Sequence, residues 1–224
     1  MITVIIITHN YKKFLDKCIN SVLKNNLKKV NEIIVIDDNS NDGTFNYLEK
    51  KYKKNKIIKV HKVKFNSLTK SMNYGINLAK SEWILKIDAD DYIHKKFIQT
   101  FAKYAKNYDF IYGNFVKFDS EFTKTSIKGS SNLMKFFKHP LGSGNLYKKK
   151  LWKKIGGYNE KIRFKDDVYF WVKLNNIKNV KIKYLEKFYY YYYRQHNHSM
   201  SKNLILKNFT LLKMILRYLC TKNI

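Results

Sequence analysis

Residues 84–93 (ILKIDADDYI) end an apolar run with three carboxylates, Asp88, Asp90 and Asp91. Two carboxylates about 4 Å apart repel each other by roughly 4 kcal/mol at an effective dielectric constant near 20. A divalent cation would offset this repulsion, because one or two acidic ligands together with substrate phosphates form the usual site for Mg²⁺ and suit Mn²⁺ as well. Asp-X-Asp alone is a weak signal that also occurs in turns, but here it follows a hydrophobic strand.

Two other acidic pairs have the residue types for chemistry. Asp37 and Asp38, in VIDDNSNDGT, offer acceptors suited to the ring N–H of a base or to ribose hydroxyls. The alternative is that one of them caps the next helix. Asp166 and Asp167, in FKDDVYFW, stand where a helix begins, and the helix dipole favours the ionised carboxylate there. Such a carboxylate could accept a proton from an attacking hydroxyl, and the alternative is simple stabilisation of the helix start.

Basic and aromatic side chains gather in YYYYYRQHNHSMS near the C-terminal end. His196 and His198 could complete a metal shell or contact phosphates, and Arg194 could contact phosphates. The tyrosines at 189–193 are typical of a packed strand, because alternate residues of a strand face opposite sides.

The elements expected to position these groups alternate along the first half of the chain. Apolar runs predict strands at 3–8, 32–36, 56–60 and 83–87, and helical periodicity predicts helices at 15–23 and 67–79. This order predicts an α/β fold with parallel strands and flanking helices, in which ligands bind beyond the carboxyl ends of the strands. The polar clusters at 8–10, 37–40 and 88–91 should therefore meet at one edge.

The second half is less regular. Strand material is expected at 109–118 and 180–193, a loop or hairpin up to residue 131, and a helix at 166–174. We expect one domain at 1–201, with a nucleotide-binding half at 1–112 and an acceptor-side half at 113–201. An amphipathic helix is expected at 202–224. It could lie in a membrane interface near a lipid-linked acceptor, or pack on the domain or on a second subunit of a homodimer.

The formal net charge is +28, from 45 basic and 17 acidic residues. Nucleic-acid binding is disfavoured, because lysines dominate and are spread over the whole chain, with only three arginines to make forked base or phosphate contacts. A surface near anionic lipid is the better interpretation. Cys18 and Cys220 do not resemble a disulfide framework, the N-terminal apolar run resembles a buried strand rather than a signal peptide, and no stretch is long enough to span a bilayer. We expect a cytoplasmic protein, at most peripheral on the inner face of the membrane.

The motifs THN, VIDDNSNDGT, SMNYGINLAKSEWILKIDADD, KKIGGYNE, DDVYFWVKL and YRQHNHSMS occur in the order found in family 2 glycosyltransferases of the GT-A fold. The sequence resembles this family up to about residue 201. The resemblance implies an inverting transfer of a sugar from a nucleotide diphosphate donor, most simply a UDP-sugar, to a glycan or lipid-linked acceptor. It also implies Mn²⁺ or Mg²⁺ as cofactor and a role in bacterial surface polysaccharide or lipooligosaccharide synthesis.

Matching the family's motifs to this chain assigns the donor site. Thr8 and Asn10 would line the nucleotide pocket. Asp38 would accept from a uracil-type ring N–H, with Asp37 as the adjacent candidate, and Asp88 would hold the ribose.

The same comparison assigns the reacting groups. Asp90 would bind the metal and His196 would lie near the metal or the diphosphate. Asp167 would be the catalytic base, with Asp166 as the second candidate.

The chain departs from the family where an arginine often precedes the asparagine now at Asn73, because Met72 stands there. Lys70 is the candidate to supply the missing positive charge to a phosphate. Two other functions remain open: a nucleotidyltransferase, which would release pyrophosphate, and a non-catalytic basic nucleic-acid-binding protein. Acceptor specificity is expected within residues 118–147.

Overall fold

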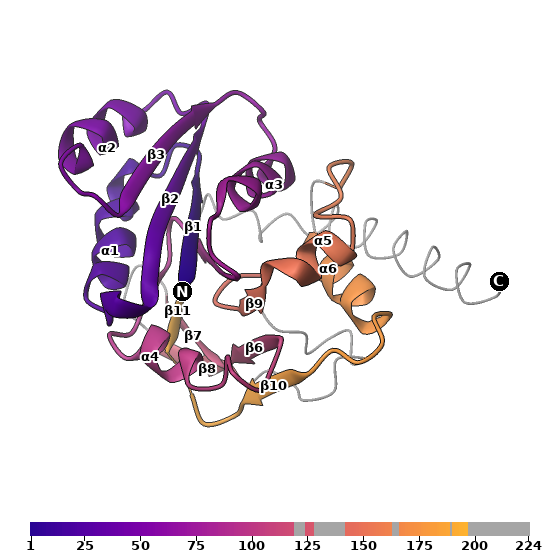
Figure 1. The fold of residues 1–224 in the computed structure, drawn as a ribbon. Helices are drawn as coiled ribbons and strands as arrows, with labels where there is room; N and C mark the ends of the chain where they lie inside the picture. Colours follow the sequence, from indigo (N-terminus) through magenta and orange to yellow (C-terminus); the bar gives the residue numbers. More distant parts are fainter. Residues whose placement is uncertain (119–123, 128–141, 163–165, 189, 197–224) are drawn as a thin grey trace.

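The computed structural model describes residues 1–118, 124–127, 142–162, 166–188 and 190–196. A seven-stranded sheet with the order β10-β6-β9-β4-β1-β2-β3 forms the centre of the described part (Figure 1). Its strands are β1 (Ile2–Thr8), β2 (Val30–Asp38), β3 (Ile58–Val63), β4 (Trp83–Asp88), β6 (Phe110–Gly113), β9 (Leu146–Lys148) and β10 (Ile182–Leu185).

The first four of these strands pair in parallel, as expected. All residues of β1 except Ile7 are buried, because helices cover the sheet on both sides and leave no solvated face. The observed strands extend the expected ones by one to three residues at their ends, and β3 begins at Ile58 rather than at residue 56. The α/β prediction is confirmed for this half of the chain.

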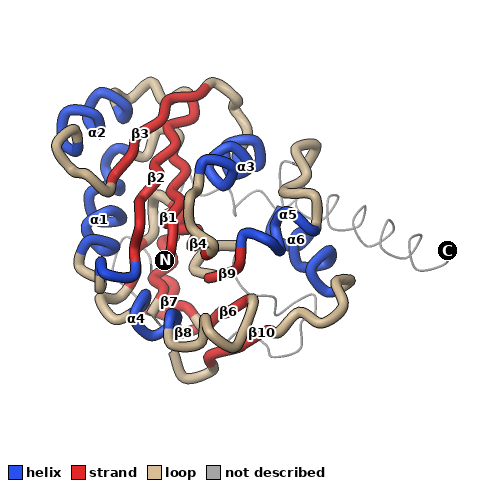
Figure 2. The backbone as a smooth tube through the Cα atoms, viewed as in Figure 1, coloured by secondary structure: helices blue, strands red, loops and turns tan. Residues whose placement is uncertain are grey.

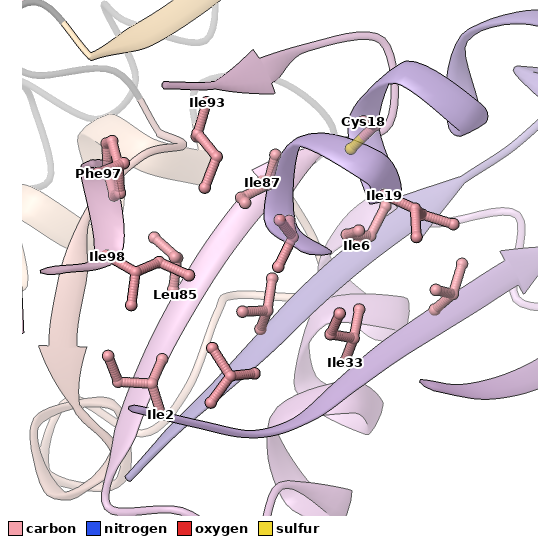
Figure 3. Close-up of a cluster of buried hydrophobic side chains, with 14 of the residues drawn as sticks. Ile2, Ile6, Cys18, Ile19, Ile33, Leu85, Ile87, Ile93, Phe97 and Ile98 are labelled. Carbon is pink, nitrogen blue, oxygen red and sulfur yellow. The ribbon is translucent and has the colours of Figure 1, made fainter. Parts of the chain in front are cut away.

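Helices cover the two faces of the sheet in separate groups (Figures 1 and 2). One face packs against α1 (Lys12–Leu23), α2 (Thr44–Tyr52) and α4 (Phe97–Ala102). The other packs against α3 (Leu68–Leu78), α5 (Lys149–Lys154) and α6 (Asp166–Asn175). Figure 3 shows part of the first core, in which side chains of α1 and α4 meet β1, β2 and β4. A 3₁₀ turn (Leu27–Lys29) leads into β2.

A second sheet has the order β5-β11-β7-β8. Its strands are β5 (Tyr92–Ile93), β7 (Phe115–Phe118), β8 (Lys124–Ile127) and β11 (Tyr191–Arg194). β5 comes directly after the aspartates that follow β4, and it pairs with β11. This pairing brings the segment around Arg194 to the carboxyl end of β4.

The strand material expected at 109–118 and 180–193 is present, but each run divides between the two sheets. Both breaks lie at the same place. The amide of Asn114 donates to the carbonyl of Phe188 at 3.0 Å, and its side chain donates to the carbonyl of Glu186. A Cβ atom on Gly113 would lie 3.1 Å from the Phe188 carbonyl oxygen. Gly113 and Asn114 therefore let their segment approach the segment around Phe188, and both segments leave the first sheet at this point.

The expected C-terminal helix at 202–224 lies outside the described residues, as do His198 and most of the expected specificity segment. The division of the domain at residues 112 and 201 stays a prediction. Within the described ranges, no helix is long and apolar enough to cross a membrane.

Candidate active site

Three polar segments meet at the carboxyl ends of β1, β2 and β4, which lie next to one another. Thr8 at the end of β1 pairs with Asp37, and Ile7 pairs with Asp88. The parallel register therefore places the segments 8–10, 37–40 and 88–91 at one edge of the sheet, as the sequence predicts.

Asp38 lies in this edge but points toward the face covered by α3. Its Oδ1 accepts from the amides of Phe65 and Asn66, both at 2.8 Å. Its Oδ2 accepts from the amide of Ser67 and the hydroxyl of Ser71, both at 2.9 Å. Four donors thus hold this buried carboxylate, which fixes the turn between β3 and α3. The base contact expected of Asp38 stays a prediction, and the carboxylate would have to share an oxygen to make it.

Asp37 points to the opposite face, as adjacent residues of a strand must. Its Oδ1 accepts from the hydroxyl of Ser40, whereas its buried Oδ2 and the buried Oγ1 of Thr8 have no hydrogen-bond partner among the described residues. Burial raises the pKa of Asp37. Both atoms therefore have capacity left for a hydrogen bond to a ligand or a water molecule.

Asn10 and His9 form the exposed rim beside this pair. Asn10 has φ of 60°, a region that asparagine tolerates better than most residues. Its amide donates to Ser40 Oγ at 2.8 Å, and its Oδ1 accepts from the amide of Asn41 at 2.8 Å. His9 Nδ1 lies 2.7 Å from the carbonyl oxygen of Asp38, so Nδ1 carries the proton. The sequence argument gave His9 no role of its own, although it stands in the first polar cluster.

The three crowded aspartates after β4 have three different environments. Asp91 is fully buried and accepts from the Tyr191 hydroxyl at 2.6 Å and the Arg194 amide at 2.8 Å. Asp88 is partly exposed, and its Oδ1 lies 3.4 Å from Lys86 Nζ. Asp91 therefore joins the two sheets, and Asp88 and Asp90 remain for chemistry.

Asp90 faces the segment that follows β11. Its Oδ2 lies 2.9 Å from His196 Nε2, and its carbonyl accepts from Arg194 Nε at 2.9 Å. The Arg194 guanidinium lies between the rings of Phe14 and Phe118, 4.8 and 4.7 Å from their centroids. The structure thus brings together the two residues that the sequence assigned to the metal.

A divalent cation fits Asp90 and His196. Burial, followed by the charge of Asp88, raises the pKa of Asp90, while the hydrogen bond from His196 lowers it. A cation would relieve this repulsion, and a carboxylate with an imidazole is a donor set that Mn²⁺ accepts. Among the described residues no group of three or more His, Cys, Asp or Glu side chains could hold a metal.

Asp166 and Asp167 begin α6, as expected, on the side of the sheet that carries Asp88. Asp167 Oδ1 accepts from the amide of Val168 at 2.9 Å. A Cβ atom on Gly142 would lie 2.8 Å from Asp167 Cβ, so glycine lets this loop pass against the aspartate. Asp167 as a residue is partly exposed.

Asp166 is buried, and its Oδ2 has no hydrogen-bond partner among the residues described. Burial raises the pKa of Asp166 to about 6, and the charges of Asp167 and Asp88 act in the same direction. Lys86 opposes them. Lys86 was not predicted as a site residue, although a lysine inside the otherwise apolar strand 83–87 was a visible signal.

Lys70 and Asn73 lie on α3 in different settings. Lys70 is exposed on the first turn, so its expected phosphate contact stays a prediction. Asn73 binds the turn after α5: its Nδ2 donates to the carbonyl of Tyr158 at 2.9 Å, and its Oδ1 accepts from the Tyr158 amide at 2.9 Å. Met72 is fully buried.

An open cavity of about 910 Å³ lies beside the rim, between the starts of α1 and α2. Of the predicted site residues it contains only Asn10, and its walls include Lys12, Phe14 and Tyr47. Because Asp88 and α6 lie on the other side of the sheet, this cavity adjoins the carboxylate cluster rather than containing it.

Comparison of the sequence with known proteins identifies a family and several relatives. A family model described as Glycosyl transferase family 2 matches residues 3–169. An uncharacterized glycosyltransferase of Mycoplasma genitalium is 30% identical over 194 residues, which cover 75% of this chain and 61% of the relative. The poly(ribitol-phosphate) β-N-acetylglucosaminyltransferase TarP of Staphylococcus aureus is 35% identical over 121 residues, which cover 51% of this chain and 36% of the relative.

Solved structures share the fold. TarS residues 1–349 of S. aureus, in complex with UDP-GlcNAc, matches with a TM-score of 0.74 at 24% identity over 90% of this chain and 60% of that one. A mannosyltransferase from Pyrobaculum calidifontis, in complex with GDP-Man and Mn²⁺, matches with a TM-score of 0.66 at 14% identity over 87% of this chain and 56% of that one. The chain spans less than two thirds of the length of these relatives.

Proposed function

Since the chain belongs to glycosyl transferase family 2 and has the GT-A fold, we propose that it transfers a sugar from a nucleoside diphosphate to an acceptor hydroxyl with inversion at the anomeric carbon. The observation that carries this proposal is the gathering of the polar ends of β1, β2 and β4 at one edge, with the charges of Asp88 and Asp167 both acting on Asp166 at the start of α6. Neither rival function needs an acidic group at the start of α6 beside a donor-binding edge.

The donor would lie along the edge formed by β1, β2 and β4. Thr8 Oγ1 and Asp37 Oδ2 have capacity for hydrogen bonds, and Asn10 stands on the exposed rim. Asp38 would keep its hydrogen bonds to the turn between β3 and α3 and share one carboxylate oxygen with the base of the nucleotide. Asp88 would bind the ribose. We take UDP as the nucleotide, because TarS, which shares the fold, is found with UDP-GlcNAc.

Transfer would be a single displacement. The acceptor oxygen attacks the anomeric carbon, its proton passes to the Asp167 carboxylate, and the bond from that carbon to the diphosphate oxygen breaks. Asp167 is preferred over Asp166 as the base because it is partly exposed, whereas Asp166 is buried. Lys70 would contact a phosphate from the first turn of α3.

Asp90 and His196 would hold Mn²⁺ or Mg²⁺. Bound there, the cation would supply a Lewis acid to the diphosphate leaving group. The residues themselves orient the donor: Asp91 and Tyr191 keep the turn 88–91 in place, and Arg194 fixes the carbonyl of Asp90.

The acceptor is proposed as a glycan or lipid-linked sugar of a bacterial surface polymer, in keeping with the poly(ribitol-phosphate) acceptor in the name of TarP. A peripheral place on the inner face of the membrane fits the net charge of +28. Liposome flotation with and without residues 203–224 tests this: loss of flotation on truncation supports membrane contact by that segment. Unchanged flotation contradicts it.

The deciding experiment measures UDP released from UDP-GlcNAc, and from other UDP-sugars, in the presence of Mn²⁺. Asp167→Asn should lower kcat by orders of magnitude with UDP affinity retained. Asp16→Asn is the control and should leave kcat unchanged, because Asp16 pairs with Lys51 and Tyr47 of α2 rather than with the strand ends. A larger loss in Asp166→Asn would move the base by one residue. Release of pyrophosphate from nucleoside triphosphates, or salt-sensitive binding of RNA without turnover of any sugar nucleotide, would overturn the proposal.

A further inference from the structure

Lys86 is a buried lysine in the middle of β4. Only 4% of its surface is exposed. Ile87 belongs to the core that faces α1, while Ile84 belongs to the core that faces α3 and α6. Since residues alternate along a strand, Lys86 points to the side of α3 and α6. A side chain of this kind normally stays in water, so its position needs a cause.

One carboxylate contacts the Lys86 ammonium, and two more act on its charge. Its Nζ lies 3.4 Å from Asp88 Oδ1, and it interacts electrostatically with Asp166 and Asp167 at the start of α6. The other titratable groups that face this cluster are Tyr147 of β9 and Tyr158 after α5, whose pKa values burial raises, so both are neutral at physiological pH. The lysine therefore contacts the donor-side carboxylate and shares the buried side of the sheet with α6, where the acceptor-side pair begins.

The charge on Lys86 is maintained by these neighbours. Burial alone lowers the pKa of a lysine, but the three aspartates outweigh burial and raise the pKa of Lys86 above its usual value. A buried ion pair is a weak source of stability, because an apolar side chain of similar volume often serves as well. Structural need alone does not explain an ammonium group at this position.

We propose, on the premise of the glycosyl transfer described above, that Lys86 is a positioning residue of that reaction. Its buried ammonium group fixes Asp88 on the donor side and keeps the Asp166–Asp167 pair ionised on the acceptor side. The base is thereby a carboxylate at the pH of the cell, although it lies near two other negative charges.

The test compares the pH dependence of kcat for UDP release from UDP-GlcNAc in the wild type, Lys86→Met and Lys86→Arg. An opposite charge nearby lowers the pKa of a carboxyl by roughly one to three pH units. Lys86→Met should therefore move the acid limb of the kcat profile to higher pH. Lys86→Arg, which keeps the charge, should restore the wild-type limb.

Lys59→Met is the matched control. Lys59 is likewise a lysine within a strand, and it pairs with a buried carboxylate, Glu32, away from the carboxyl ends of the strands. It should lower the melting temperature without moving the acid limb. An unmoved limb in Lys86→Met would overturn the role of Lys86 and leave the transferase function standing. If Lys86→Met does not fold, Lys86→Gln replaces it; if neither folds, Lys86 is a structural residue and the proposal is wrong. Absence of turnover in the wild type with every UDP-sugar would refute the transferase function instead.

Discussion

Replacing Asp38 by asparagine separates a structural role of this residue from a role in binding the base. The carboxylate accepts four hydrogen bonds, two on each oxygen. In Asp38→Asn one oxygen becomes an NH₂ group. In the least costly arrangement this NH₂ group faces the Ser71 hydroxyl, which can accept a hydrogen bond from it. The NH₂ group then also faces the Ser67 amide, which cannot accept a hydrogen bond.

The cost has two parts. The Ser67 amide is left without its acceptor, which costs about 1–3 kcal/mol, and the two bonds retained on the other oxygen lose their charge assistance. Because these amides are only partly buried, we expect a total loss of roughly 2–4 kcal/mol in the free energy of unfolding. For a chain of this length that corresponds to about 4–16 °C in Tm.

Thermal unfolding by circular dichroism measures this change, and calorimetry with UDP measures binding separately. Asp37→Asn is the control in the neighbouring residue, because Asp37 has one hydrogen bond to Ser40 and an oxygen without a partner among the described residues. An amide there keeps the Ser40 bond, so Tm should change little. The reasoning would be refuted by an Asp38→Asn protein with an unchanged Tm and a weakened affinity for UDP.

Three other outcomes follow from the geometry. Gly144→Ala should cost roughly 2–5 kcal/mol, because φ is +74° and the new Cβ would lie 2.5 Å from the Tyr191 ring. Gly156→Ala, at φ +80° with nothing within 4 Å of the new Cβ, should cost only about 1–2 kcal/mol in urea unfolding; equal losses would contradict this. Asp166→Asn should raise the free energy of unfolding by up to about 3 kcal/mol above pH 6, because the folded pKa of about 6 exceeds the usual 3.8 and the ionised form is therefore disfavoured in the fold. This gain should disappear below about pH 4, where both states are protonated, and a gain that is independent of pH would refute the cause. EDTA should weaken UDP binding in calorimetry, and Asp90→Asn should remove the difference between EDTA and Mn²⁺; wild-type binding that is indifferent to EDTA would exclude a metal role for Asp90.

Local patterns were enough to predict the strands of the first half and the edge where their polar ends meet. The apolar runs in β1, β2 and β4 are long, and each ends in a polar cluster. The strand material at 109–118 and 180–193 was also predicted, but its division between two sheets was not, because the break in each run depends on contacts between Asn114 and the carbonyls near residue 188. Each run taken alone has the composition of one continuous strand.

The sequence by itself determined which residue types gather at the edge, since parallel strands bring their carboxyl ends together wherever they pair. Only the tertiary structure decided what each carboxylate does. Asp90 meets a histidine 106 positions away, and Asp91 meets a tyrosine 100 positions away. These neighbours set burial, hydrogen bonding and local charge, and a pKa depends on all three. No periodicity within a strand contains that information.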